Sequence, residues 1–152
     1  MNLILVPIDA SDASEKVVTE AARLAGLTGA SVSLLHVVEP VASYIPVGAS
    51  MDVITAEPQI PDEALTESAK SRLEEIAEPL RKRGLKIDCL ALTGLAVDEI
   101  VEQATSLKTD YIVMGSHGHG AIFHLFSGSV VTGVLKHSPC PVVVVPVRHP
   151  AK

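Results

Sequence analysis

Runs of apolar, mostly β-branched residues recur along this chain, and they restrict its fold more than any other feature. Residues 142–145, for example, are four consecutive valines. Strands that read as continuous apolar runs, without polar alternation, are typical of parallel sheets buried on both faces. The pattern predicts strands at residues 3–8, 32–38, 85–92, 111–114 and 142–147.

Segments with apolar residues at helical spacing separate these runs. We expect helices at residues 12–26, 60–84, 98–107 and 129–136. Strict alternation of strands and helices predicts an α/β fold, in which one five-stranded parallel sheet has right-handed crossovers and helices on both faces. With 152 residues, 47% of them hydrophobic, we expect a single domain over residues 1–152.

Charge and composition argue against several classes of protein. The formal net charge is −6 and the largest basic cluster is residues 81–83, so we expect no nucleic acid partner. The apolar runs are too short to cross a bilayer, and the first residues lack the features of a signal peptide. Cys89 and Cys140 are isolated in the sequence. We expect them to be buried thiols of a reducing compartment, and the protein to be cytoplasmic.

A glycine-rich segment follows the fourth expected strand directly. It reads Met114-Gly115-Ser116-His117-Gly118-His119-Gly120, and nine residues separate Gly118 from the following Gly128-Ser129-Val130. Such glycines let backbone N–H groups approach a ligand, and the second group lies at an expected helix start, where anions bind. No lysine or arginine lies between residues 108 and 136, so a bound polyphosphate would depend on amides and a metal ion. The alternative is that these glycines are ordinary turn residues.

These segments together resemble the universal stress protein family. The resemblance rests on Val6-Pro7-Ile8-Asp9-Ala10-Ser11, on Leu34-Leu35-His36-Val37 and on the spacing Gly-2x-Gly-9x-Gly-Ser/Thr, and it covers residues 2–147. In that family the glycine spacing distinguishes the members that bind ATP. The resemblance implies a Rossmann-like, adenine nucleotide alpha hydrolase-like sheet of order 3-2-1-4-5. It also implies a homodimer that pairs through the C-terminal edge strand and acts in the stress response.

The resemblance further implies a site for ATP, or another adenine nucleotide, with Mg²⁺ or Mn²⁺. Asp9 would lie by the ribose or the metal and phosphates, as the metal ligand, while Pro7 would line the base pocket and Val37 would offer main-chain atoms to adenine. The remaining residues would surround the ribose and phosphates: Met114, Gly115, His117, Gly118, His119, Gly120, Gly128, Ser129 and Val130. Ala10 departs slightly from the family, which often has glycine there.

Other interpretations of single residues remain open at this stage. Asp9 and Ser129 are also suited to cap helices. Three histidines, His117, His119 and His124, raise the alternative of a zinc site, although they are better placed to donate hydrogen bonds or to face solvent. His36, within an apolar strand, is expected to be a core histidine with satisfied hydrogen bonds.

Two regions and the reaction itself are left with alternatives. Residues 39–61 are long and apolar for a connection, which suits either a lid over the nucleotide or a surface for a protein partner. The valine-rich last strand needs either a second subunit or the tail of residues 148–152 to cover its edge. Binding with little or no hydrolysis is the expected function, because no general base is evident. The alternatives are a weak ATPase or phosphotransferase, and a scaffold that binds no nucleotide.

Overall fold

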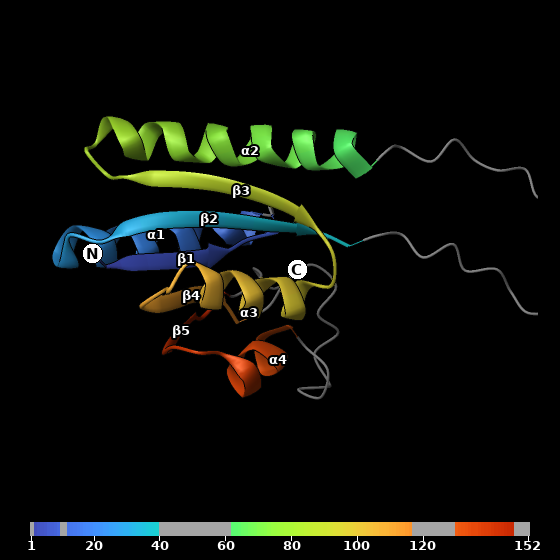
Figure 1. Ribbon diagram of the computed structural model, residues 1–152. Coiled ribbons are helices and arrows are strands. Elements are labelled where there is room, and N and C mark those ends of the chain that lie inside the picture. Colours follow the sequence, from blue (N-terminus) through green and yellow to red (C-terminus); the bar gives the residue numbers. More distant parts are fainter. Residues whose placement is uncertain (1, 10–11, 40–61, 117–129, 148–152) are drawn as a thin grey trace, which may run out of the picture.

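The computed structural model describes residues 2–9, 12–39, 62–116 and 130–147. Helices and strands alternate along the described chain, and the five strands form one parallel sheet of order β3-β2-β1-β4-β5 (Figure 1). This confirms the expected fold class and strand order. The elements are β1 (Leu3–Pro7), α1 (Asp12–Thr28), β2 (Ser31–Val38), α2 (Asp62–Lys82), β3 (Ile87–Thr93), α3 (Ala96–Ser106), β4 (Tyr111–Gly115), α4 (Val130–His137) and β5 (Val142–Val145).

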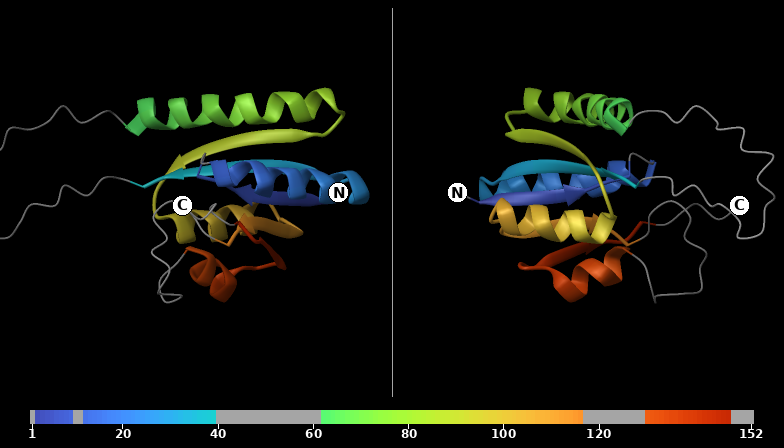
Figure 2. Two further views of the ribbon diagram at one scale, coloured as in Figure 1. Left: turned by 180° about the vertical axis from the view of Figure 1, so that it is seen from behind. Right: turned by 45° about the vertical axis from the view of Figure 1, so that its right-hand side comes forward.

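Helices cover both faces of the sheet. Helices α1 and α2 pack on one face, and α3 and α4 pack on the other; Figure 2 shows the arrangement from behind and in a view turned by 45°. The central strand β1 serves both layers, because Ile4 and Val6 point to the first and Leu5 to the second, all fully buried. This two-sided burial explains why the strand reads as a continuous apolar run.

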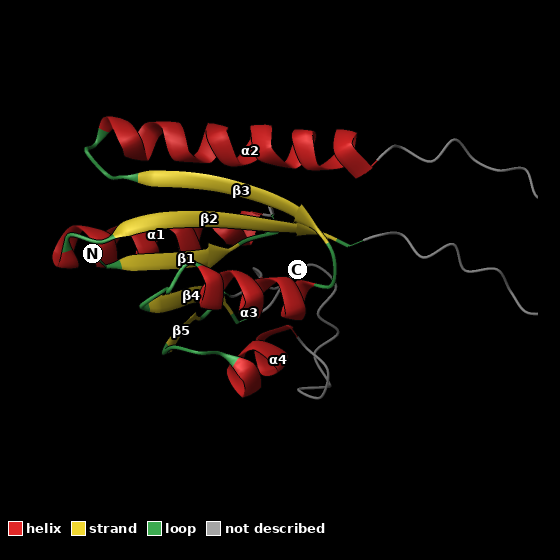
Figure 3. Ribbon diagram, in the orientation of Figure 1, coloured by secondary structure: helices red, strands yellow, loops and turns green. Residues whose placement is uncertain are grey.

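Figure 3 shows the helices in red and the strands in yellow. Several element ends differ from the sequence prediction by a few residues. The first helix was expected to end at Gly26 but continues to Thr28, and Gly29 follows it with a φ of 71°. Gly29, not Gly26, therefore supplies the left-handed residue that ends the helix. Gly84 was expected to close the helix that became α2, and this is confirmed, since Gly84 lies just after α2 with a φ of 90°. The last strand ends at Val145, because the N–H of Val147, the next one to face β4, donates to the hydroxyl of Ser116 and not to a backbone carbonyl.

Both sheet edges expose side chains that the sequence suggested would be buried. Cys89 lies on the edge strand β3 and Cys140 precedes the edge strand β5, and both are half-buried, so the expectation of buried thiols was wrong. Val143 and Val144 are partly exposed on β5, as expected of an edge strand. In the described ranges, no helix has both the length and the apolar character needed to cross a membrane.

Candidate functional site

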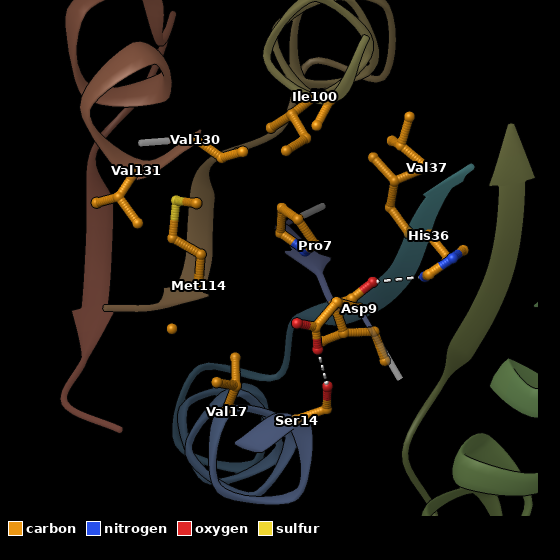
Figure 4. Close-up of a pocket in the computed structure, with 14 residues that line it drawn as sticks. Pro7, Asp9, Ser14, Val17, His36, Val37, Ile100, Met114, Val130 and Val131 are labelled. Atoms are coloured by element: carbon orange, nitrogen blue, oxygen red, sulfur yellow. Dashed lines mark hydrogen bonds between the residues drawn. The ribbon is translucent and has the colours of Figure 1, made fainter. Parts of the chain in front are cut away.

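A pocket lies at the carboxyl ends of the central strands. Strand β1 has β2 on one side and β4 on the other, so the chain changes direction across the sheet at this point. Parallel α/β sheets bind ligands at such a switch point. The described residues that line the pocket come from three strands and three helix starts (Figure 4): Pro7, Ile8, Asp9, Ser14, Val17, Leu35, His36, Val37, Ala96, Ile100, Met114, Gly115, Val130 and Val131.

Most of the wall is apolar. Pro7 lies in the middle of the view in Figure 4, with Val37 toward β2 and Met114 toward β4, while Ile100 of α3 lies opposite α1. The pocket has a volume of about 160 Å³. Sites for drug-sized ligands run from roughly 300 to 1,000 Å³. The described walls therefore suit one flat apolar group, such as a base, and leave the remainder of a larger ligand outside them.

Asp9 supplies the negative charge at this pocket. It is the one carboxylate among the described lining residues, which include no lysine or arginine. Its Oδ1 accepts a hydrogen bond of 3.1 Å from the hydroxyl of Ser14, which is only 5% exposed in the first turn of α1. The bond to a buried hydroxyl holds this exposed carboxylate beside the helix start, where the helix dipole favours a negative charge.

Helices α3 and α4, which pack on the same face of the sheet and both start at the pocket, differ in the charge of their first turns. The first turn of α3 carries Asp98 and Glu99, and the N–H of Ala96 donates to the carboxylate of Glu39 at 3.2 Å. The first turn of α4, which begins at Val130, has no acidic residue. Since a helix start attracts anions, the start of α4 suits an anion better than the start of α3, where three carboxylates gather.

The beginning of the glycine-rich segment is tied to the last strand. The N–H of Ser116 donates to the carbonyl of Val145 at 2.9 Å, and the hydroxyl of Ser116 accepts from the N–H of Val147 at 3.1 Å. These bonds extend the pairing of β4 with β5 beyond Gly115. The chain therefore leaves β4 from a fixed point next to the pocket.

Six of the residues named from the sequence line this one pocket: Pro7, Asp9, Val37, Met114, Gly115 and Val130. The other candidates, His117, Gly118, His119, Gly120, Gly128 and Ser129, lie outside the described residues, as do His124 and residues 40–61. Among the described residues, no group of three or more His, Cys, Asp or Glu side chains is placed to hold a metal ion.

The sequence reasoning missed several lining residues. His36 was expected in the core, but it is half-buried, lines the pocket and has its Nδ1 2.9 Å from the carbonyl oxygen of Ile8. Ile100 and Val131 lie on apolar helix faces that look like ordinary core positions. Ser14 carried no distinguishing signal, because a serine in the first turn of a helix is common.

Comparison with known proteins gives consistent results. The model of the universal stress protein family matches residues 1–146. A universal stress protein from Methanocaldococcus jannaschii is 33% identical over 144 residues, which are 93% of this chain and 80% of that protein. The solved structure of a second universal stress protein from that organism has a TM-score of 0.77 and 29% identity, and the match covers 98% of both chains.

A more distant solved structure adds a ligand. The universal stress protein from Archaeoglobus fulgidus in complex with dAMP has a TM-score of 0.66, and the match covers 95% of this chain and 97% of that one. At 24% identity this likeness shows the fold alone. The family match over almost the whole chain and the 33% identical relative are decisive: this chain belongs to the universal stress protein family.

Proposed function

We propose that this protein binds an adenine nucleotide, ATP with Mg²⁺ or Mn²⁺, in the pocket at the carboxyl ends of β1, β2 and β4. One observation carries the proposal: six residues selected from the sequence for nucleotide contact line a single pocket at the switch point of the sheet. The family fold holds dAMP in the Archaeoglobus fulgidus protein, so an adenine nucleotide is compatible with this architecture.

The charge distribution gives the nucleotide an orientation. The base fits the apolar wall formed by Pro7, Val37 and Ile100, where the carboxylates at the start of α3 disfavour phosphate. The phosphates then extend toward Val130 at the start of α4, which has no acid in its first turn. His117, Gly118, His119, Gly120, Gly128 and Ser129 are proposed to complete the ribose and phosphate contacts.

Asp9 is the proposed protein ligand of the metal. Mg²⁺ is commonly held by one or two carboxylates together with phosphate oxygens and water. A single exposed carboxylate at the pocket fits that mode, whereas an all-protein cage needs more donors than the described residues gather here. When bound, the ion would neutralise phosphate charge. The described lining residues include no lysine or arginine that could do so.

We also propose a cytoplasmic homodimer that pairs through β5 and acts as a nucleotide-dependent regulator in the stress response. Strand β5 is an edge strand, and Val143 and Val144 on it are 39% and 36% exposed. An apolar edge of this kind is liable to aggregate unless it is paired. Pairing with β5 of a second copy, related by a twofold axis, would cover the edge of each sheet.

The test compares two substitutions of the same size at the start of α4. Val130→Glu adds a negative charge where the phosphates are placed, and Val130→Gln adds the same bulk without charge. An acid in the first turn of a helix does not harm folding, so both variants are expected to fold. Isothermal titration calorimetry with Mg-ATP should show at least about tenfold weaker binding for the glutamate variant than for the glutamine variant, which corresponds to about 1.4 kcal/mol.

The outcomes separate the proposed functions. If both variants bind equally, the phosphates do not lie at α4 and the orientation is wrong. If the unsubstituted protein binds no adenine nucleotide, the protein is better explained as a scaffold. Phosphate release by the unsubstituted protein that stops in the Asp9→Ala variant would show an ATPase, against the expectation of binding with little or no hydrolysis.

A further inference from the structure

His36 has no part in the function proposed above, although it is the one histidine among the described lining residues. It lies on β2 between Leu35 and Val37, and its ring is half-buried. The Nδ1 atom is 2.9 Å from the carbonyl oxygen of Ile8 (Figure 4). A carbonyl oxygen only accepts hydrogen bonds, so Nδ1 carries the hydrogen and donates it.

This bond extends the attachment of the chain to β2 beyond the end of β1. Strand β1 ends at Pro7, yet the N–H of Ile8 donates to the carbonyl of Leu35 at 2.9 Å. With the His36 ring bound to its carbonyl, both backbone polar groups of Ile8 are held by β2. Asp9, the next residue, therefore starts from a fixed peptide.

Asp9 is held from the other side as well. Its carboxylate accepts the hydroxyl of Ser14, which is 5% exposed in the first turn of α1. Besides the bond from the N–H of Ile8 to Leu35, the segment from Ile8 to Asp9 is thus held by a ring on β2 and by a hydroxyl on α1 (Figure 4). A protein side chain that is already ordered before the ligand binds contributes more affinity, because binding then does not have to overcome the entropy loss of ordering it.

We propose that His36 is a positioning residue for the nucleotide: it holds the carbonyl of Ile8 and thereby keeps Asp9 at the pocket. This inference rests on the proposed function, since it assigns to His36 a role in that same site. The ring acts through Asp9 and is not itself required to touch the ligand.

The experiment uses two substitutions that differ in one donor. His36→Asn keeps a donor, because the amide Nδ2 is the same number of bonds from Cα as Nδ1 of histidine. His36→Phe keeps a ring of similar size and has no donor. The dissociation constant for Mg-ATP is measured for both by isothermal titration calorimetry, and circular dichroism and urea unfolding report whether each variant is folded.

We expect about tenfold weaker binding for His36→Phe and a value within about threefold of the unsubstituted protein for His36→Asn, as loss of one hydrogen bond predicts. Should the phenylalanine variant fail to fold, His36→Val, which suits a strand and also lacks a donor, provides the same comparison. Equal affinity of the donor and non-donor variants would overturn the proposal.

A double-mutant cycle with Asp9→Ala tests whether His36 acts through Asp9. In the Asp9→Ala background, His36→Phe should change affinity by less than about twofold, because coupled residues lose their effect together. A full tenfold loss in that background would show that His36 acts by another route and would overturn the proposal. If the unsubstituted protein binds no adenine nucleotide, the proposed function and this role both fail, whereas binding that is insensitive to His36 refutes the positioning role alone.

Discussion

The contact between α3 and α4 beside the pocket predicts whether a substitution of Gly133 raises or lowers the free energy of unfolding. Gly133 lies within α4, and a Cβ added there would be 2.6 Å from Cγ2 and 3.0 Å from Cγ1 of Val97 on α3. Carbon atoms pack best at roughly 3.5–4.0 Å. Valine has one strongly preferred rotamer in a helix, so the clash is not relieved by rotation of its side chain.

Gly133→Ala should therefore destabilise the protein, although alanine is the better helix former. The overpacking costs about 1–3 kcal/mol, and the gain in helix propensity offsets about 1 kcal/mol of it. We expect the free energy of unfolding in urea to fall by about 1 kcal/mol, or about 2–4 °C in Tm for a chain of this size. Because α4 begins at Val130 in the pocket wall, Mg-ATP affinity should fall too.

Gly26 is the matched control, since it lies within α1 and a Cβ there meets nothing within 4 Å. Gly26→Ala should stabilise the protein by about 0.5–1 kcal/mol. In a Val97→Ala background the clash is removed, so Gly133→Ala should become stabilising like Gly26→Ala. If Gly133→Ala stabilises the unsubstituted protein, the packing argument for α3 and α4 is refuted.

Three further predictions concern other parts of the chain. Val143→Glu on the β5 edge should yield a monomer in size-exclusion chromatography with light scattering, and an unchanged dimer would refute pairing through β5. Pro79→Ala within α2 should raise the free energy of unfolding in urea by about 1–2 kcal/mol, because proline removes a helix hydrogen bond. Burial, with Glu74 nearby, raises the pKa of Cys89 from 9.0 to about 11. In a Cys140→Ala background, folded protein at pH 8 should react with iodoacetamide more slowly than protein in urea, and equal rates would contradict this. The stabilisation linked to this thiol is fully present below pH 9.0 and is lost as pH rises through about 11.

The order of elements was predictable because it depends on periodicity. Apolar runs such as residues 142–145 fix where strands lie, and alternation with helices fixes a parallel sheet. Helix ends were less predictable. The sequence does not distinguish Gly26 from Gly29 as the end of α1, and only the positive φ of Gly29 does so. The apolar pocket wall was also hidden, because Ile100 packs against the core and lines the pocket with the same side chain.

The charge difference between the starts of α3 and α4 depends partly on one contact that is distant in sequence. Glu39 caps Ala96 across 57 positions, so the negative charge at the start of α3 combines nearby Asp98 and Glu99 with a residue from the end of β2. All the helices of a parallel sheet start at the same edge and offer the same dipole. A fold with equal helix starts has no preferred direction for a phosphate chain. In this protein the carboxylates at the start of α3 leave the start of α4 as the favourable place for the phosphates. The negative charge introduced by Val130→Glu is therefore expected to weaken the binding of Mg-ATP.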